Sequence, residues 1–403
     1  MKLLLFSQKL IYSGANIVAI DLAGQMKDLG HEVIVYGPEG PMVDRLSELG
    51  LDYRAANTGH EFNTQWPSLR TSRELRKLVK AEGIDLVHTY EWPACLEALM
   101  GPYRADGVPL VASVMSMRVE RFMPRSIPVI VGTRGLRDGL VRSKYRSVTF
   151  IPPSIDVRND SAGFGLSDFR KEIDMPDEAM MVAIVSRLSP MKMQSTLEAM
   201  EAIAELSKTK DVRLVIVGGG SSENEAKEKA RTLNSVLSRD VICFTGPLGD
   251  PRPVYDAADV VIGMGSSALR GLAFSKPVIV VGDNGYAELF TPETSGEFVV
   301  QGLWGLGEGD GVKRIRNHLE ILLDDVSQRE TLGNFGRKFV CERFALEKQA
   351  EALSRVYEQA LEHPPQPSDR RFDVARTIAL LVTERGKGLI RRRGRRLTKL
   401  PQA

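Results

Sequence analysis

The stretch Val260–Asp283 reads VVIGMGSSALRGLAFSKPVIVVGD and decides the fold class of the region around it. An apolar run, VVI, ends in Gly-Met-Gly-Ser-Ser-Ala, and after a helix-like segment a second apolar run, PVIVV, ends in Gly-Asp. The order strand, tight turn, helix, strand is the unit from which parallel sheets are built. The turn also fits the G-x-G-x-x-A form of the dinucleotide fingerprint, with an acidic residue about twenty positions after its first glycine.

The glycines of this turn are consistent with a phosphate-binding loop. Gly263 and Gly265 would let the backbone approach an anion, and the amides of Ser266 and Ser267 would lie at a helix N-terminus, where negative charge is stabilised. In dehydrogenases the fingerprint opens the nucleotide domain, whereas several strand-like runs precede it here. We therefore favour a phosphate ligand other than NAD, with a purely structural turn as the alternative because tight turns select small residues in any case.

Two earlier segments carry a similar signal. In VAIVSRLSPMKM, Arg187 directly follows a buried strand and Lys192 lies five residues on, where a helix begins. Two cations at the end of a strand suit a diphosphate, although solvated side chains on a loop are the alternative. In LVIVGGGSSENE, residues Gly218 to Gly220 again join a strand to a helix, and a plain turn capped by Ser221 or Ser222 is the alternative there.

Strand-like apolar runs and helical patterns alternate in two blocks along the chain. The runs cover residues 2–6, 31–37, 85–90, 109–114 and 128–133 in the first block, and 180–186, 212–220, 241–246, 259–265 and 277–283 in the second. This alternation predicts two doubly wound α/β domains of similar size. Because Pro152 and Pro153 neither continue a helix nor donate to a sheet, the boundary is expected near 151. We expect domains at 1–150 and 151–345, a helix at 346–362, and a linker with a basic tail at 363–403.

Composition sets the broad class of the protein. Of 403 residues, 43% are apolar and 26% charged, which is typical of a globular protein with a large core. Cys95, Cys243 and Cys341 lie far apart with no C-x-x-C pair, so a disulfide framework and structural zinc are not expected. The apolar run at the N-terminus is too short for a signal peptide, and we expect a cytoplasmic protein.

Together these segments resemble the family-four retaining glycosyltransferases, which have the GT-B fold. SRLSPMK is similar to the family's G-R-L-x-x-x-K, LVIVGGG to its strand ending in G-x-G, ICFTGPL to its F-x-G, YDAADVVI to its Y-x-x-A-D-V, and LAFSKPVIVVGDNGYAEL to its A-M-A-x-G-x-P-V-I…G-G-x-x-E. The first block carries three further similarities. The family's acceptor-side loop and helix are similar to SGANIVAIDLAGQMKDLGHEV, its D-V-V-H is similar to DLVHTYEW, and its I-P-N-G-I-D is similar to IPPSID. The resemblance covers most of residues 1–360.

The resemblance implies two Rossmann-like domains facing across a cleft and transfer of a sugar from a nucleoside-diphosphate donor. Arg187, Lys192 and Glu288 would be catalytic, the two cations stabilising charge on the leaving diphosphate without a metal and Glu288 approaching the sugar. The donor contacts would be Gly14, Ala15, Gly218, Gly220, Leu248 near the base, Gly265, Ser266, Ser267 and Arg270. No cofactor is implied beyond the donor substrate.

Some positions depart from the family pattern. Arg270 stands where the family has the Glu of E-A-M-A, and an Arg cannot accept hydrogen bonds from ribose hydroxyls. Ile262 replaces a second glutamate, and Met115 stands where many relatives carry a histidine. Arg270 would add a third cation to the diphosphate site, or the donor is held in an unusual way, or the protein is a non-catalytic subunit that binds a nucleotide or a partner glycosyltransferase.

The acceptor side offers two candidates. His88 ends a predicted buried strand, and it would contact the sugar or acceptor unless it is a hydrogen-bonded core residue. Glu91 follows it as a polar candidate for an acceptor hydroxyl. The acceptor itself, whether a glycan, a lipid-linked molecule or a small molecule, is not specified by these residues.

The basic end of the chain is a separate electrostatic feature. From Asp369 onward there are eleven Lys or Arg and three Asp or Glu, a net charge of +8, so the first 368 residues sum to −6. Apolar residues beside cations, as in IALLVTERGKGLIRRRGRR, are typical of helices that lie on an anionic membrane, here the inner face. A solvated tail is the alternative, and Gly386 and Gly388 argue against one continuous helix. Nucleic acid is not expected, because interleaved aromatics are missing.

Overall fold

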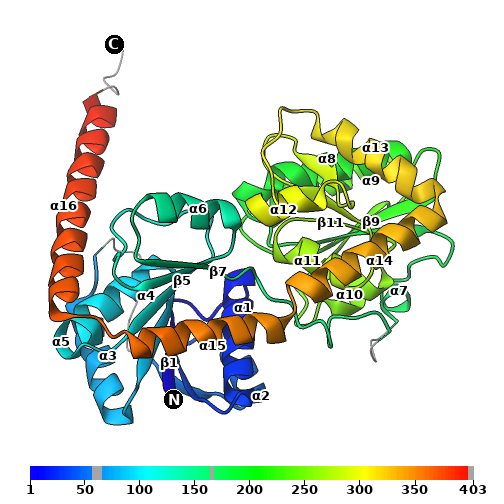
Figure 1. Ribbon diagram of the computed structural model, residues 1–403. Helices are drawn as coiled ribbons and strands as arrows, with labels where there is room; N and C mark the ends of the chain where they lie inside the picture. The colour runs from blue at the N-terminus through cyan, green and yellow to red at the C-terminus, as the bar shows by residue number, and fades with distance from the viewer. Residues whose placement is uncertain (57–65, 164–167, 398–403) are drawn as a thin grey trace. The chain divides into compact units, whose positions relative to one another are not determined.

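The computed structural model describes residues 1–56, 66–163 and 168–397, with side chains up to Glu384 in the last helix. The chain divides into two compact units, Met1–Pro153 with Gln349–Ala403, and Ser154–Lys348. Each unit contains a sheet flanked by helices, and both are shown in Figure 1. The doubly wound α/β class predicted from the sequence is confirmed in each unit.

The first unit is built on a parallel sheet of seven strands among the described residues, in the order β3-β2-β1-β4-β5-β6-β7. The strands are β1 (Lys2–Ser7), β2 (Glu32–Gly37), β3 (Asp52–Ala55), β4 (Leu86–Tyr90), β5 (Leu110–Val114), β6 (Pro128–Val131) and β7 (Ser147–Phe150). The helices are α1 (Gly14–Asp28), α2 (Val43–Glu48), α3 (Leu69–Glu82), α4 (Glu91–Ala98), α5 (Arg104–Asp106), α6 (Arg134–Arg142), α15 (Leu346–Glu362) and α16 (Pro367–Leu397), and a π-helical segment spans Leu99–Tyr103. The strand order reverses between β1 and β4, where polar loops and helix starts gather in such folds.

The second unit has a six-stranded sheet in the order β10-β9-β8-β11-β12-β13, in which β13 alone of these strands pairs antiparallel. The strands are β8 (Met180–Val185), β9 (Val212–Val217), β10 (Ile242–Gly246), β11 (Val260–Gly263), β12 (Val278–Val281) and β13 (Ala287–Leu289). The helices are α7 (Phe169–Glu172), α8 (Pro190–Leu206), α9 (Glu223–Leu237), α10 (Arg252–Ala257), α11 (Ser266–Ala273), α12 (Ser295–Gln301), α13 (Gly311–Asp324) and α14 (Val326–Arg343). Here the order reverses between β8 and β11.

Three of the four edge strands in the described sheets were missed in the sequence, whereas the fourth, β10, was predicted within residues 241–246. The strands β3, β7 and β13 lie at sheet edges, and β3 and β7 contain no fully buried residue. The central strands are buried on both faces and therefore read as continuous apolar runs, whereas an edge strand such as β3, DYRA, keeps polar residues.

The C-terminal helices belong to the first unit, α15 from Gln349 onward. Helix α15 has the predicted bounds, but the prediction that Gly386 and Gly388 interrupt the tail is wrong, because α16 continues through both. A glycine costs a helix only about 1 kcal/mol relative to alanine, which does not stop a helix whose earlier turns are fixed by packing. Among the described residues, no helix combines the length and the apolar character needed to cross a membrane.

Candidate diphosphate-binding site

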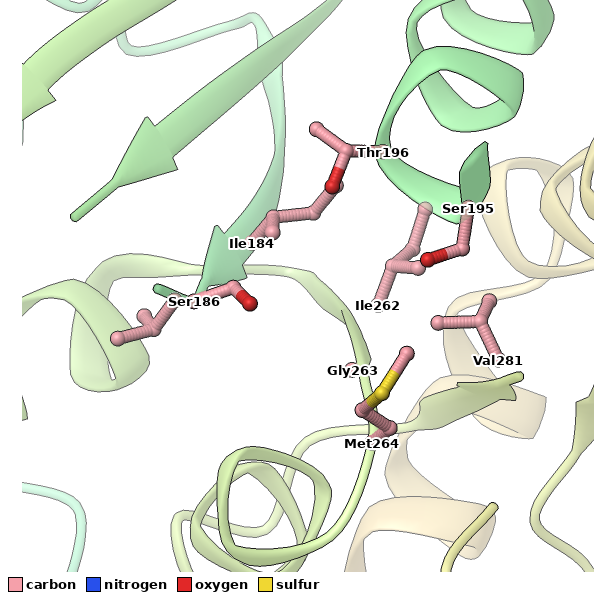
Figure 2. A pocket seen from close by; sticks show the side chains of 9 residues that line it. Ile184, Ser186, Ser195, Thr196, Ile262, Gly263, Met264 and Val281 are labelled. Atoms are coloured by element: carbon pink, nitrogen blue, oxygen red, sulfur yellow. The ribbon is translucent and has the colours of Figure 1, made fainter. Parts of the chain in front are cut away.

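The carboxyl ends of β8 and β11 meet where the strand order of the second unit reverses. In open α/β sheets, ligands bind outside this point. A small hollow of about 10 Å³, room for roughly one water, lies there. Figure 2 shows Ser186 at the end of β8, Ser195 and Thr196 on α8, and Met264 after β11 around it. Ser195 and Thr196 donate to the carbonyl of Lys192 at 3.1 and 3.0 Å, so their hydroxyls brace the start of α8.

Arg187 and Lys192 flank the turn between β8 and α8. Arg187 is exposed, and Lys192 is half-buried in the first turn of α8, which begins at Pro190 after Ser189. Burial lowers the pKa of Lys192, and the positive charge of Arg187 lowers it further. Within the described parts of the chain, neither cation forms an ion pair with a carboxylate. Two neighbouring uncompensated cations at this point form a site suited to an anion.

Gly218 and Gly220 position this turn. A Cβ on Gly218 would lie 2.0 Å from the Ser186 carbonyl oxygen, and one on Gly220 would lie 2.2 Å from that of Leu188. Both glycines have positive φ, +132° and +154°. The Gly218 amide donates to Gly246 O at 2.9 Å, so this amide is already hydrogen-bonded within the fold. The structure thus favours the turn alternative for these two glycines: they let the loop pack against the backbone on both sides of Arg187.

Ser222 is the N-cap residue of α9, but its side chain makes no capping bond. The sequence alternative of a serine-capped turn is therefore correct in position only.

The turn at residues 263–267 has the predicted form. Helix α11 begins at Ser266, so the amides of Ser266 and Ser267 lie in its first turn. Gly265 has φ +58° and donates its amide to Leu303 O at 2.7 Å. The Tyr255 hydroxyl donates to Ser267 Oγ at 3.2 Å. The helix start is therefore fixed from two sides, although the Gly265 amide itself is used within the fold.

Arg270 is compensated, and this disfavours its role as a third free cation. Its Nε donates to Asp160 Oδ2 at 3.0 Å, and the side chains are 20% and 5% exposed. Arg337 donates to the main-chain oxygen of Asp160 and so fixes the backbone that carries this carboxylate. Sequence reasoning missed Asp160 because it lies 110 positions from Arg270 in an irregular segment, with no spacing pattern that connects them.

Leu248 and Glu288 lie apart along the sheet edges. Leu248 is 38% exposed in the turn after β10. Glu288 lies on β13 with its carboxylate oxygens 4.0 Å from Arg314 Nη1 and 4.0 Å from His318 Nε2 of α13. Burial lowers the pKa of His318, while the Glu288 carboxylate opposes that shift.

In the first unit, Gly14 and Ala15 begin α1, as the phosphate-loop expectation requires. The preceding Ser13 caps this helix by accepting from the Asn16 amide at 3.3 Å. Both residues are partly exposed, so the amide end of α1 remains a candidate anion contact.

His88 is a core residue, which is the alternative to an acceptor contact. It is 1% exposed, and its Nδ1 and Nε2 lie 2.6 Å from the Tyr357 hydroxyl and 2.8 Å from Ser113 Oγ. Burial lowers its pKa to about 3, so the ring is neutral. With both nitrogens engaged inside the fold, His88 links β4 and β5 to α15 and has no group left for a ligand.

The Glu91 carboxylate is also engaged. It accepts from the amides of Met115 and Ser116 at 2.9 Å each and from Ser116 Oγ at 2.8 Å. Glu91 has φ +65°, a strained conformation for a residue with a side chain. These bonds fix the turn after β5, where Met115 lies, so a positioning role fits Glu91 better than an acceptor contact.

Two family models match the chain. "Glycosyltransferase Family 4" matches residues 12–159 and "Glycosyl transferases group 1" matches residues 167–339, so together they cover most of the sequence. The chain belongs to glycosyltransferase family 4. As a family 4 glycosyltransferase it has the GT-B fold and uses a nucleotide-sugar donor with retention.

Relatives of this family 4 glycosyltransferase differ in what they act on. A D-inositol 3-phosphate glycosyltransferase of Kineococcus radiotolerans is 24% identical over 87% of this chain and 91% of its own. A GDP-mannose-dependent monoacylated alpha-(1-6)-phosphatidylinositol monomannoside mannosyltransferase of Corynebacterium glutamicum is 28% identical over 51% of this chain and 55% of its own. The crystal structure of Anabaena Alr3699/HepE in complex with UDP superimposes with a TM-score of 0.69 at 17% identity, over 89% of this chain and all of that one, which shows the shared fold.

Proposed function

We propose that this family 4 glycosyltransferase holds the diphosphate of its donor with Arg187, Lys192 and the amide end of α11, and transfers the sugar to a lipid-linked or cell-envelope acceptor without a metal. The observation that carries the proposal is the pair of neighbouring cations, uncompensated within the described chain, at the β8–β11 reversal. Burial lowers the pKa of Lys192 and the positive charge of Arg187 lowers it further, so an anion bound beside both cations would offset both effects.

The chemistry follows from where charge develops. Cleavage of the bond between the anomeric carbon and the β-phosphate oxygen leaves an additional negative charge on the diphosphate. The backbone that carries Arg187 and Lys192 is fixed before the reaction by the bonds from Leu188 N to Gly219 O and from Lys192 N to Ser189 O, so the two cations would stabilise that charge with little reorganisation of the fold. Leu248 would contact the base and Glu288 the sugar.

The acceptor class rests on relatives and on charge. The two relatives above are named for an inositol phosphate and a phosphatidylinositol mannoside, both negatively charged. The strongly basic C-terminal end of this chain would favour an acceptor at an anionic surface, with the enzyme peripheral on the inner membrane face.

The test is release of nucleoside diphosphate from UDP-, GDP-, ADP- and TDP-sugars, with membrane lipid extract as the source of acceptor. Arg187→Ala and Lys192→Ala should each lower kcat about 10²- to 10³-fold, as loss of a preorganised charge contact does. The control Lys208→Ala removes an exposed lysine of the same unit and should leave kcat unchanged. The chelator EDTA should leave the rate unchanged, and the product anomer should match that of the donor.

Wild-type rates in both cation variants would contradict the proposed grip. If no donor is consumed but a nucleotide still binds, the chain is the non-catalytic binding subunit that Arg270 and Met115 first suggested, and the transfer proposal is wrong.

A further inference from the structure

Helix α16 lies outside the two matched family segments and is fixed tightly to the first unit. Asp373 is fully buried and accepts from the Arg125 and Ser126 amides at 2.9 and 3.2 Å and from the Tyr103 hydroxyl at 3.2 Å. Thr377 Oγ1 donates to Phe122 O at 2.8 Å. These contacts define one face of α16, at spacing i and i+4, that packs on the unit.

The opposite face of α16 is apolar and exposed. One helical stripe, with the spacing i, i+3, i+7, i+10, consists of Phe372, Ala375, Ala379 and Val382, and Ile378 borders it. Phe372 is 57% exposed, Val382 55% and Ile378 39%. We call these five residues the outer stripe. Because buried polar bonds anchor the facing side, the outer stripe is held in a fixed direction.

Positive charge follows the outer stripe along the same helix. Residues 385–397 contain seven Lys or Arg and no Asp or Glu, and α16 continues through them (Figure 1). This charge disfavours a second copy of the chain as the occupant, because two such segments repel. A surface that is both negative and able to take up apolar side chains matches the two features together.

We propose that the outer stripe and the basic end of α16 dock the first unit on an anionic lipid surface, with Phe372, Ile378 and Val382 entering the headgroup layer. Arg376 donates to the carbonyl oxygens of Arg121 and Met123 at 2.6 and 2.8 Å, which ties the docking helix to the loop that follows β5. This inference rests on the membrane part of the proposed function, whereas the diphosphate site belongs to the other unit, so nucleotide binding tests that site separately from docking.

The experiment is sedimentation of the full chain with vesicles of phosphatidylcholine containing phosphatidylglycerol, and with phosphatidylcholine alone. The wild type should bind the anionic vesicles and not the neutral ones, and binding should weaken as salt rises. Phe372→Ser with Val382→Ser should weaken binding about tenfold or more, because two apolar side chains no longer insert. The matched control is Val236→Ser, which changes a residue 76% exposed on α9 of the other unit and should have no effect.

Nucleotide affinity of the same variants separates docking from folding and from the diphosphate site, and it should equal that of the wild type. Equal vesicle binding by the outer-stripe variant and the wild type would overturn the proposal, as would failure of the wild type to bind anionic vesicles. If the chain binds heparin or RNA as strongly as vesicles and the outer-stripe variant retains that binding, the partner is a soluble polyanion and the lipid proposal is also overturned.

Discussion

At the scale of single residues, the site depends on charges that the fold leaves uncompensated and charges that it neutralises. Lys192 has a lowered pKa from burial and from Arg187, and neither pairs with a carboxylate of the described chain. Arg270, the residue that looked most unusual in the sequence, is instead neutralised by Asp160. Two arginines of the same unit therefore have different roles: Arg187 remains available to an anion, whereas Arg270 pairs with Asp160, and only their contacts distinguish them.

The lowered pKa of Lys192 predicts how nucleotide binding depends on pH. A diphosphate binds the protonated lysine, so affinity should fall as pH rises through that lowered pKa, below the range of an ordinary lysine. Arg187→Met removes the repelling charge and should move this alkaline limb to higher pH while weakening binding overall. Calorimetric titration of the nucleotide from neutral pH to about pH 10.5 measures both effects. A limb that does not move in Arg187→Met would show that the two cations are not coupled.

The Asp160–Arg270 pair predicts a strong coupling between two positions distant in sequence. Arg270→Glu should lower the free energy of unfolding by about 3–5 kcal/mol, because it places a second carboxylate beside the buried Asp160. Adding Asp160→Asn should recover part of that loss. Urea denaturation of the two single variants and the double variant measures the coupling, and additive effects would contradict the ion pair. A glutamate restored at 270 is therefore best assayed for activity together with Asp160→Asn.

At the scale of elements, the loop after β9 holds the loop after β8 through glycine backbone. Leu188 N donates to Gly219 O at 3.0 Å and Ser222 N donates to Leu188 O at 3.1 Å. The two loops thus form one rigid support around Arg187, and the glycines on it serve packing more than ligand contact.

The contact between the two loops predicts that Gly218→Ala, although it adds only one methyl group, lowers both stability and nucleotide affinity. The added Cβ meets a backbone oxygen, and φ +132° is unfavourable for alanine, so we expect a loss of at least about 2 kcal/mol in stability and weaker nucleotide binding. The control Gly296→Ala lies in α12 of the same unit with nothing within 4 Å of the added Cβ, and it should be neutral or stabilising by up to about 1 kcal/mol. Thermal denaturation compares them, and equal melting temperatures would refute the packing argument.

At the scale of the whole molecule, the sequence predicted the elements that depend on short stretches of residues, namely the buried strands and the turns. Buried central strands read as apolar runs and the turns before α8 and α11 fell where their glycine, proline and serine residues placed them. The edge strands β3 and β7 were missed because a half-exposed strand carries no such run, and β13 was missed because it has only three residues. Asp160 lies 110 positions from Arg270 and Tyr357 lies 269 positions from His88, and pairings of that kind follow from the tertiary fold.

The function proposed here depends on Arg187 and Lys192 binding a nucleoside diphosphate at the carboxyl ends of β8 and β11. Its most direct test is calorimetric titration of UDP, GDP, ADP and TDP into the wild type and into the Arg187→Ala/Lys192→Ala double variant. We expect at least one of them to bind the wild type and the double variant to lose at least about 100-fold in affinity, since two charge-assisted contacts are removed. Equal affinity in the two proteins, or no binding of any of the four to the wild type, would contradict it.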